Sequence, residues 1–217
     1  MPTRSADDSH SGLITVQYLA LGDSYTIGER VDVNQRWPVQ LAQALREHGY
    51  VVEGPIIIAQ TGWTTDELMA GIQRQNVDGT FDLVSLLIGV NNQYRGRDID
   101  GYRVDFRTFL EQAIGFAKGD TGRVIVLSIP DWGVTPYAEG RDREQIAAEI
   151  DHFNAVNREE TERAGARYVD VTSVSREAAR DGELIASDGL HPSGKMYAAW
   201  VRLVLPEALS ALGSGGR

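Results

Sequence analysis

The chain has 217 residues, of which 42% are hydrophobic and 24% charged, and its formal net charge is −10. This composition is typical of a globular protein with a sizeable core, and no apolar segment approaches the length of a membrane-spanning helix. The negative charge repels phosphate backbones and argues against nucleic acid as a partner. The absence of cysteine excludes disulfides, thiolate metal sites and cysteine nucleophiles.

A single domain is expected over residues 13–212, because no linker-like change in composition divides the chain. The short polar ends, residues 1–12 and 213–217, are expected to be flexible. The first twelve residues lack the apolar stretch of a secretory signal, and a chain without cysteine fits a reducing compartment. The expectation is therefore a cytoplasmic protein.

Predicted strands and helices alternate along the chain. Apolar runs and apolar residues at helical spacing predict, in order, a strand at 13–21, a helix at 37–48, a strand at 50–58, a helix from Thr64 or Thr65, a strand at 82–88, a helix at 102–118, a strand at 123–129, a helix at 142–163, a strand at 166–171 and a helix at 193–212. Loops are expected at 25–36, 89–94, 130–140 and 181–192. This alternation predicts a five-stranded parallel sheet with helices on both faces.

The first predicted strand ends in Gly22, Asp23 and Ser24. A polar turn at the carboxyl end of a parallel strand lies where open α/β sheets hold their ligands, so Ser24 is a candidate nucleophile. Gly, Asp and Ser are also ordinary turn residues, which is the competing interpretation. Neither the G-x-S-x-G elbow of α/β-hydrolases nor a glycine-rich phosphate loop is present.

Asp188 and His191 lie three residues apart, just before the last predicted helix. A serine hydroxyl needs an adjacent base, usually an imidazole oriented by a carboxylate, and this pair contains both groups. Two other interpretations remain open: His191 as a turn residue at the start of the helix, and the pair as metal ligands, although two ligands alone are weak support for a metal.

Acyl transfer also requires hydrogen-bond donors directed at the oxyanion. The loops that carry Gly62 and Asn91 follow the second and third predicted strands, so they should meet Ser24 at one edge of the sheet. The backbone N–H groups of Ser24 and Gly62 and the side-chain amide of Asn91 are suitable donors. Taken alone, Gly62 and Asn91 are each better explained as ordinary turn residues.

Taken together, these motifs resemble the SGNH (GDSL-type) hydrolase family over about residues 18–197. The resemblance rests on G-D-S at residues 22–24, Gly62, G-x-N at residues 89–91, and D-x-x-H-P at residues 188–192. It implies a flavodoxin-like three-layer α/β/α sandwich, a triad of Ser24, Asp188 and His191, and an oxyanion hole of Ser24, Gly62 and Asn91. Asn92 stands where many members have an acid, so no role of that acid is carried over.

The resulting hypothesis is a serine hydrolase that cleaves carboxylic esters with small or medium acyl groups, without a metal or other cofactor. The expected pocket residues are Tyr25, Trp63, Asn92, Tyr94 and Trp132. Acyl transfer to another acceptor and carbohydrate deacetylation remain alternatives on the same site, as does a binding module without turnover. Lysophospholipids and thioesters are also possible substrates, because substrate choice depends on details of the pocket.

Overall fold

A computed structural model describes residues 14–213 of the chain. The expected flexible segments 1–12 and 214–217 lie outside the described residues, as does Leu13 at the start of the first predicted strand. Gly213, which was expected in the flexible tail, instead ends the last helix.

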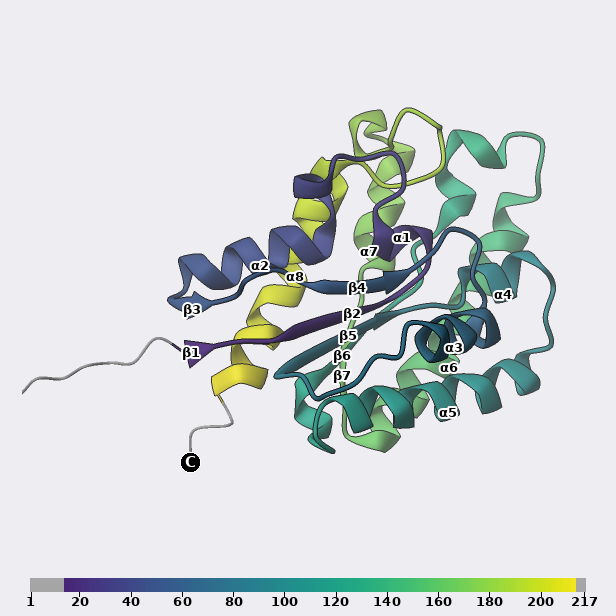
Figure 1. Ribbon diagram of the computed structural model, residues 1–217. Coiled ribbons are helices and arrows are strands. Elements are labelled where there is room, and N and C mark those ends of the chain that lie inside the picture. Colours follow the sequence, from purple (N-terminus) through teal and green to yellow (C-terminus); the bar gives the residue numbers. More distant parts are fainter. Residues whose placement is uncertain (1–13, 214–217) are drawn as a thin grey trace, which may run out of the picture.

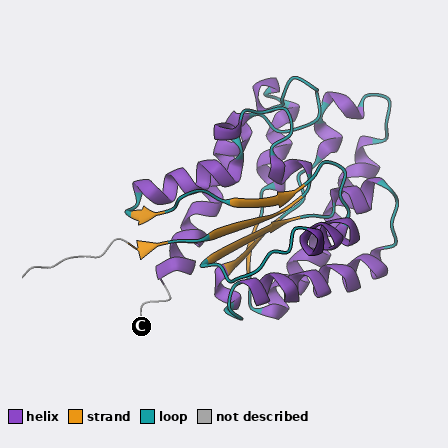
Figure 2. Cartoon of the chain, in the orientation of Figure 1, coloured by secondary structure: helices purple, strands orange, loops and turns teal. Residues whose placement is uncertain are grey.

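The centre of the molecule is a five-stranded parallel sheet (Figure 2). Its order is β4-β2-β5-β6-β7, formed by β2 (Tyr18–Gly22), β4 (Ile56–Ala59), β5 (Leu83–Leu87), β6 (Val124–Leu127) and β7 (Arg167–Val169). All four neighbouring pairs are parallel. In order of sequence the strands are arranged 2-1-3-4-5, which is the flavodoxin-like order, and the predicted fold is confirmed.

Helices cover both faces of the sheet (Figure 1). One face carries α2 (Trp37–Glu47) and α8 (Gly194–Gly213), which pack against each other. The other carries α3 (Thr65–Arg74), α5 (Ile99–Phe116) and α6 (Arg143–Ala164). The start of α3 is fixed by a capping box, in which the side chains of Thr64 and Glu67 satisfy each other's backbone N–H groups.

Two of the predicted strands are divided. The segments expected at 13–21 and 50–58 each contribute a two-residue strand, β1 (Ile14–Thr15) and β3 (Tyr50–Val51), to a separate parallel pair. Pro55 precedes β4 and has no N–H to donate to a ladder, which accounts for the break before that strand. The central sheet therefore contains only the second part of each of these two predicted strands.

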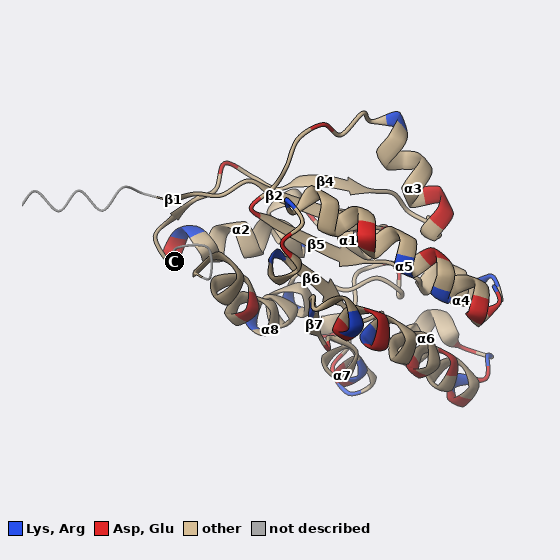
Figure 3. Ribbon diagram, turned by 90° about the horizontal axis from the view of Figure 1, so that it is seen from below, with Lys and Arg blue, Asp and Glu red and all other residues tan. Residues whose placement is uncertain are grey.

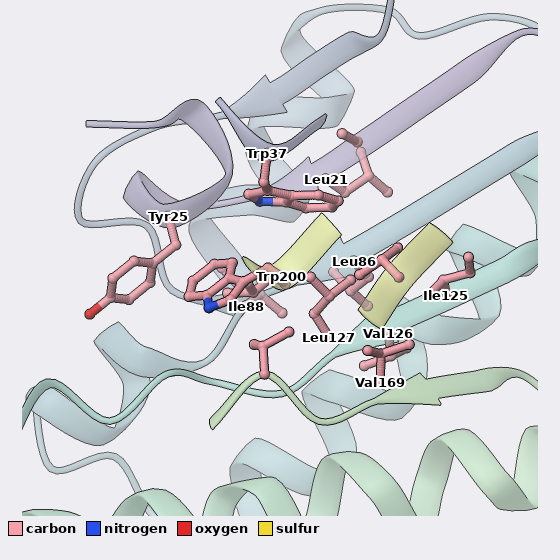
Figure 4. Packing of buried hydrophobic residues seen from close by; sticks show 14 of the residues in the cluster. Leu21, Tyr25, Trp37, Leu86, Ile88, Ile125, Val126, Leu127, Val169 and Trp200 are labelled. Carbon is pink, nitrogen blue, oxygen red and sulfur yellow. The ribbon is translucent and has the colours of Figure 1, made fainter. Parts of the chain in front are cut away.

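In the core, apolar residues of the strands pack beside one tryptophan from each of α2 and α8 (Figure 4). All residues of β2, β5 and β6 are buried, as expected for central parallel strands covered on both faces. Trp37 of α2 and Trp200 of α8 are fully buried on one face of the sheet. This packing holds the strands rigidly up to their carboxyl ends, where the candidate site lies.

The outer faces of α5 and α6 carry many charged side chains (Figure 3). Glu160 of α6 accepts hydrogen bonds from Arg103 and Arg107 of α5 and from Arg163 of α6. We call these four residues the α5–α6 seam. Within residues 14–213, the helices are too short or too polar to cross a membrane.

Candidate active site

The candidate residues meet at the carboxyl ends of β2 and β5, which are neighbours although β4 lies between them in sequence. This is the point where the strand order reverses, and open α/β sheets bind ligands there. Two short helices begin at this edge, α1 (Ser24–Ile27) and α4 (Val90–Tyr94), and Figure 1 shows both at the same end of the sheet. Both segments were expected to be loops. A single helical turn lacks the repeated apolar spacing that predicts a helix.

Ser24 is the first residue of α1 and is 5% exposed. The turn that positions it requires glycine at position 22, because a Cβ there would collide with Thr26 Oγ1 and with the Leu87 carbonyl of β5. Asp23 caps the helix by accepting a hydrogen bond from the Tyr25 N–H at 3.0 Å. The end of β2 and the start of α1 therefore hold the serine in one place.

Asp23 itself is fully buried. Burial raises its pKa from 3.8 to about 7, although the Tyr25 N–H lowers the pKa in part. Its second carboxyl oxygen, Oδ2, has no hydrogen-bond partner among the described residues. An incompletely satisfied acid thus lies directly beside the candidate nucleophile.

His191 and Asp188 form a hydrogen-bonded pair. His191 Nδ1 lies 2.6 Å from Asp188 Oδ2, and the other carboxyl oxygen accepts the backbone N–H groups of Leu190 and His191 at 3.0 Å each. Burial raises the pKa of Asp188, but these hydrogen bonds outweigh it and leave the pKa below 3.8. Asp188 is therefore ionised and orients the imidazole through Nδ1, which leaves Nε2 for the cavity.

The imidazole is itself nearly buried, with 7% of His191 exposed, and the Tyr25 ring packs edge-on against it at 5.7 Å between centroids. Ser24 and His191 line the same cavity. Within the described residues no hydrogen bond joins the Ser24 hydroxyl to His191. Such contacts are often long in the absence of substrate and shorten in the complex.

Two residues that line the cavity have a backbone N–H without a protein partner among the described residues. Within the part of the chain that the structure describes, neither the Ser24 N–H nor the Gly62 N–H donates to another protein group. The first belongs to the orphan donors of a helix start. Gly62 has a φ of 86°, a conformation that favours glycine. Free backbone donors at a cavity are the groups that an oxyanion hole requires.

The segment that carries Gly62 is tied to α4 by three side chains. Asn91 Nδ2 donates to the Trp63 carbonyl at 2.9 Å, and Arg95 donates to the Gly62 carbonyl at 2.6 Å. Asn92 accepts from the Thr65 N–H at 3.2 Å and donates to the Thr65 hydroxyl at 2.9 Å. The bond to Trp63 fixes the Asn91 amide and leaves its second N–H for a ligand.

The cavity at this point has a volume of about 160 Å³. Its walls are mostly aromatic and aliphatic and contain the predicted Ser24, Tyr25, Gly62, Asn91, Tyr94, Trp132 and His191, together with Thr61, Val90, Tyr137 and Leu190. The last four were not predicted at the pocket. Tyr137 shares its loop with Trp132. Val90 and Leu190 directly precede Asn91 and His191. These three could therefore have been predicted from their closeness in sequence to a candidate residue.

Two residues expected at the pocket lie elsewhere. Trp63 is 7% exposed, and its ring packs so closely on Gly71 of α3 that a Cβ there would collide with it. Asn92 is 2% exposed and is engaged with Thr65. Both follow a candidate residue directly, and in a short turn the next side chain points in a different direction. They support the site from behind and do not line it.

The sequence analysis left open that Asp188 and His191 bind a metal ion, which would require at least one further ligand nearby. Within residues 14–213, no three side chains of His, Asp or Glu are grouped closely enough to hold a metal ion. Among the described arginines and lysines, Arg30 alone pairs with Asp188, and its Nε lies 3.9 Å from Oδ2. That arginine side chain is 61% exposed, so the pair is weak.

Comparison with known proteins relates both the sequence and the fold to hydrolases. An arylesterase from Vibrio mimicus is 36% identical over 81 residues, which is 36% of this chain and only 38% of that protein. The crystal structure of TesA superposes with a TM-score of 0.70 at 19% identity, covering 90% of this chain and 99% of that one. The acetylxylan esterase Axe2 from Geobacillus stearothermophilus superposes with a TM-score of 0.64 at 22% identity, covering 89% and 94%.

These likenesses of structure establish the fold, and the family rests on the sequence. Residues 20–199 match the GDSL-like lipase/acylhydrolase family, and this range contains every candidate catalytic residue. The predicted resemblance is confirmed. The chain belongs to the GDSL-like lipase/acylhydrolase (SGNH) family of esterases and acylhydrolases.

Proposed function

We propose that the protein is a serine hydrolase that cleaves carboxylic esters of small or medium acyl groups through an acyl-serine intermediate. One observation carries the proposal: Ser24, with a free backbone N–H, shares a cavity with His191, whose other ring nitrogen is held by Asp188. A hydroxyl, a base and an orienting carboxylate in this order are the groups that activate a serine.

In the first half-reaction, His191 Nε2 accepts the proton of the Ser24 hydroxyl while Oγ attacks the carbonyl carbon of the ester. The charge of Asp188 stabilises the imidazolium that forms. The carbonyl oxygen becomes an oxyanion, which accepts hydrogen bonds from the N–H groups of Ser24 and Gly62 and from the Asn91 amide. Each such donor lowers the barrier by about 3 to 4 kcal/mol.

The tetrahedral intermediate collapses when the C–O bond to the alcohol breaks and His191 returns its proton to the leaving oxygen. The alcohol departs and the acyl group remains on Ser24 Oγ. A water molecule then gives a proton to His191 and attacks the acyl carbon through the same oxyanion contacts. When the second intermediate collapses, the bond between the acyl carbon and Ser24 Oγ breaks and His191 returns its proton to Oγ, which releases the carboxylic acid and restores the Ser24 hydroxyl.

Two alternatives on the same site differ in the acceptor or the alcohol. Acyl transfer requires that a second alcohol replaces water in the last step. Carbohydrate deacetylation is favoured by one specific observation: Tyr94 and Tyr137 at the cavity are 44% and 43% exposed, and exposed rings beside a site suit a sugar face. A binding module has no use for an oriented base beside a serine, which argues against the non-catalytic alternative.

The decisive experiment compares Ser24→Ala with Ser187→Ala, an exposed serine in the loop that carries His191. With p-nitrophenyl acetate and butyrate, we expect kcat of Ser24→Ala to fall on the order of 10⁶-fold, as when the nucleophile of a serine triad is removed. A fluorophosphonate probe should label the wild type and Ser187→Ala but not Ser24→Ala. Turnover or labelling that survives Ser24→Ala would refute the proposal.

Asn91→Ala tests the oxyanion hole separately. We expect kcat to fall by about 10² to 10³ while KM changes little, because the amide acts mainly on the transition state. An unchanged kcat would remove Asn91 from the oxyanion hole. Panels of acetylated sugars and of alternative alcohols then distinguish ester hydrolysis from deacetylation and acyl transfer.

A further inference from the structure

Three aromatic rings form one wall of the cavity. They come from separate segments: Tyr94 from the end of α4, and Trp132 and Tyr137 from the loop after β6. Their centroids lie between 5.4 and 6.5 Å apart in edge-on or tilted pairs. We call these three residues the aromatic wall.

The members of the wall differ in how they are held. Trp132 is 4% exposed, and its indole N–H donates to Gln93 at 2.9 Å. Tyr94 and Tyr137 are more than 40% exposed, so packing alone leaves them freedom to rotate. They hydrogen-bond to each other through their hydroxyls at 3.0 Å. Their position therefore depends on contacts at the surface.

Arg141 makes those contacts. Its guanidinium carbon lies 5.3 Å from the centroid of each of the three rings, and it donates a hydrogen bond to the Tyr94 hydroxyl at 3.2 Å. Hydrogen bonds from Tyr137 and Arg141 lower the pKa of Tyr94 below 10. Arg141 does not line the cavity, so it holds the rings from outside. A guanidinium stacks on aromatic faces and donates in the same plane, which a lysine ammonium cannot do.

The order of the reaction distinguishes the two sides of an ester site. The alcohol must leave before water attacks, so its natural place is toward open solvent. The acyl group stays on Ser24 through both half-reactions and can occupy a closed end. A cavity of about 150 Å³ holds a molecule the size of benzene, so the 160 Å³ here matches a short acyl chain.

We propose that Arg141 is a specificity-determining positioning residue: by holding Tyr94 and Tyr137 against Trp132, it closes the acyl end of the cavity and restricts the enzyme to short acyl groups. This inference rests on the proposed ester hydrolysis. Loosening the wall opens the closed end, so longer acyl chains gain relative to acetate. The reaction at Ser24 itself is unaffected, because Arg141 touches no reacting atom.

The test measures kcat/KM for p-nitrophenyl acetate and octanoate in the wild type, Arg141→Gln and Arg141→Lys. We expect Arg141→Gln to raise the octanoate-to-acetate ratio at least about tenfold, the lower end of what one methylene contributes in an apolar pocket. Most of the change should appear in KM for octanoate, with kcat for acetate unchanged. Arg141→Lys keeps the charge without the planar fork and should give an intermediate ratio.

Arg97→Gln is the matched control. Arg97 follows α4, its side chain is 53% exposed, and it pairs with Asp66 at 3.9 Å; it makes no cation–π contact with the rings of the wall. Arg97→Gln removes the same charge as Arg141→Gln and should leave the octanoate-to-acetate ratio of kcat/KM unchanged. Ethyl and octyl acetate, followed by acid release, vary the alcohol and should not respond to Arg141→Gln. Thermal unfolding confirms that each variant is folded.

The outcomes separate the two proposals. If the wild type hydrolyses esters but Arg141→Gln leaves the acyl ratio unchanged, or shifts the alcohol series instead, the role of Arg141 is refuted and the hydrolase remains. An equal shift in Arg97→Gln also refutes it, since the effect is then one of net charge. If the wild type cleaves no ester and takes no fluorophosphonate, the proposed function fails and this inference with it.

Discussion

Asp23 and Glu160 are both buried carboxylates, and their surroundings treat them in opposite ways. At the carboxyl edge of the sheet, Asp23 has one hydrogen-bonded oxygen and one without a partner, and burial raises its pKa to about 7. In the α5–α6 seam, burial also raises the pKa of Glu160, but hydrogen bonds from Arg103 and Arg107 outweigh it, and the pKa falls below 4.5. Burial raises the pKa at both places, and the hydrogen-bond partners of each carboxylate decide whether it is charged.

The comparison shows that the two regions differ in how completely their buried polar groups are hydrogen-bonded. No residue of the seam lines the cavity, and Glu160 accepts hydrogen bonds from three arginines. Within residues 14–213, the edge that carries Ser24 leaves one oxygen of a buried acid and two backbone N–H groups without a partner. Unsatisfied groups at a functional site are tolerated because the surrounding core over-determines their positions. Activity and stability should therefore respond to different substitutions.

The largest expected effect is at the edge. Asp188→Asn keeps a side chain of the same size but offers an amide to His191 Nδ1 and favours the wrong tautomer, so kcat should fall on the order of 10⁴-fold. The thermal unfolding temperature should change little, because the Asp188 side chain is at the surface, 20% exposed, and Asn still accepts from the loop N–H groups. A variant with near-normal kcat would show that Asp188 does not orient the base.

A second prediction concerns Asp23 and its pH dependence. Its folded pKa, about 7, lies above the unfolded value of 3.8, so the unfolded state loses the proton first and stability falls as pH rises from about 4 to 7. Asp23→Asn removes this cost. Its free energy of unfolding should exceed that of the wild type by up to about 4 kcal/mol at pH 8.

The difference should shrink as pH falls and should vanish well below pH 3.8, where Asp23 is neutral in both the folded and the unfolded protein. Urea unfolding at several pH values measures this, with Asp78→Asn, an exposed position, as the control. A difference that is independent of pH would mean that the pKa of Asp23 is the same in the folded and the unfolded protein. It would remove the contrast between the two buried carboxylates.

The smallest expected effect is in the seam. Glu160→Gln leaves three arginines without their shared carboxylate, and since these side chains are 30 to 54% exposed, water compensates them in part. We expect a loss of about 2 kcal/mol in the free energy of unfolding, in the range for hydrogen bonds to charged groups. Hydrolysis of p-nitrophenyl acetate by the folded variant should be unchanged.

Glu162→Gln is the matched control, because Glu162 is an exposed glutamate on the same helix. The loss in Glu160→Gln should be greatest near neutral pH and should shrink as pH falls through the folded pKa of Glu160, where the wild-type carboxylate is protonated as well. Equal stability of the two variants would show that the seam contributes nothing beyond surface charge.

The elements that were predicted well are those with a strong local pattern. The helices at 37–48 and 142–163 and the strand at 82–88 match α2, α6 and β5 to within one or two residues. A helix buried on one face has apolar residues at helical spacing, and a strand buried on both faces is a continuous apolar run, so both can be recognised in the sequence. Single-turn helices such as α1 and α4 leave none, because their conformation is fixed by the ends of β2 and β5.

The candidate catalytic residues could be named because their types and order are constrained by chemistry. Sequence alone determined the fold class, the family and the set of Ser24, Gly62, Asn91, Asp188 and His191, whose roles await the experiments above. Only the tertiary structure decided which neighbours line the cavity. Trp63 and Asn92 turn away from it, whereas Tyr137 and Leu190 face it, because side-chain direction in a short turn depends on packing between distant segments. The contact of Arg141 with three rings follows from the same cause: no local pattern encodes a meeting of two separate loops.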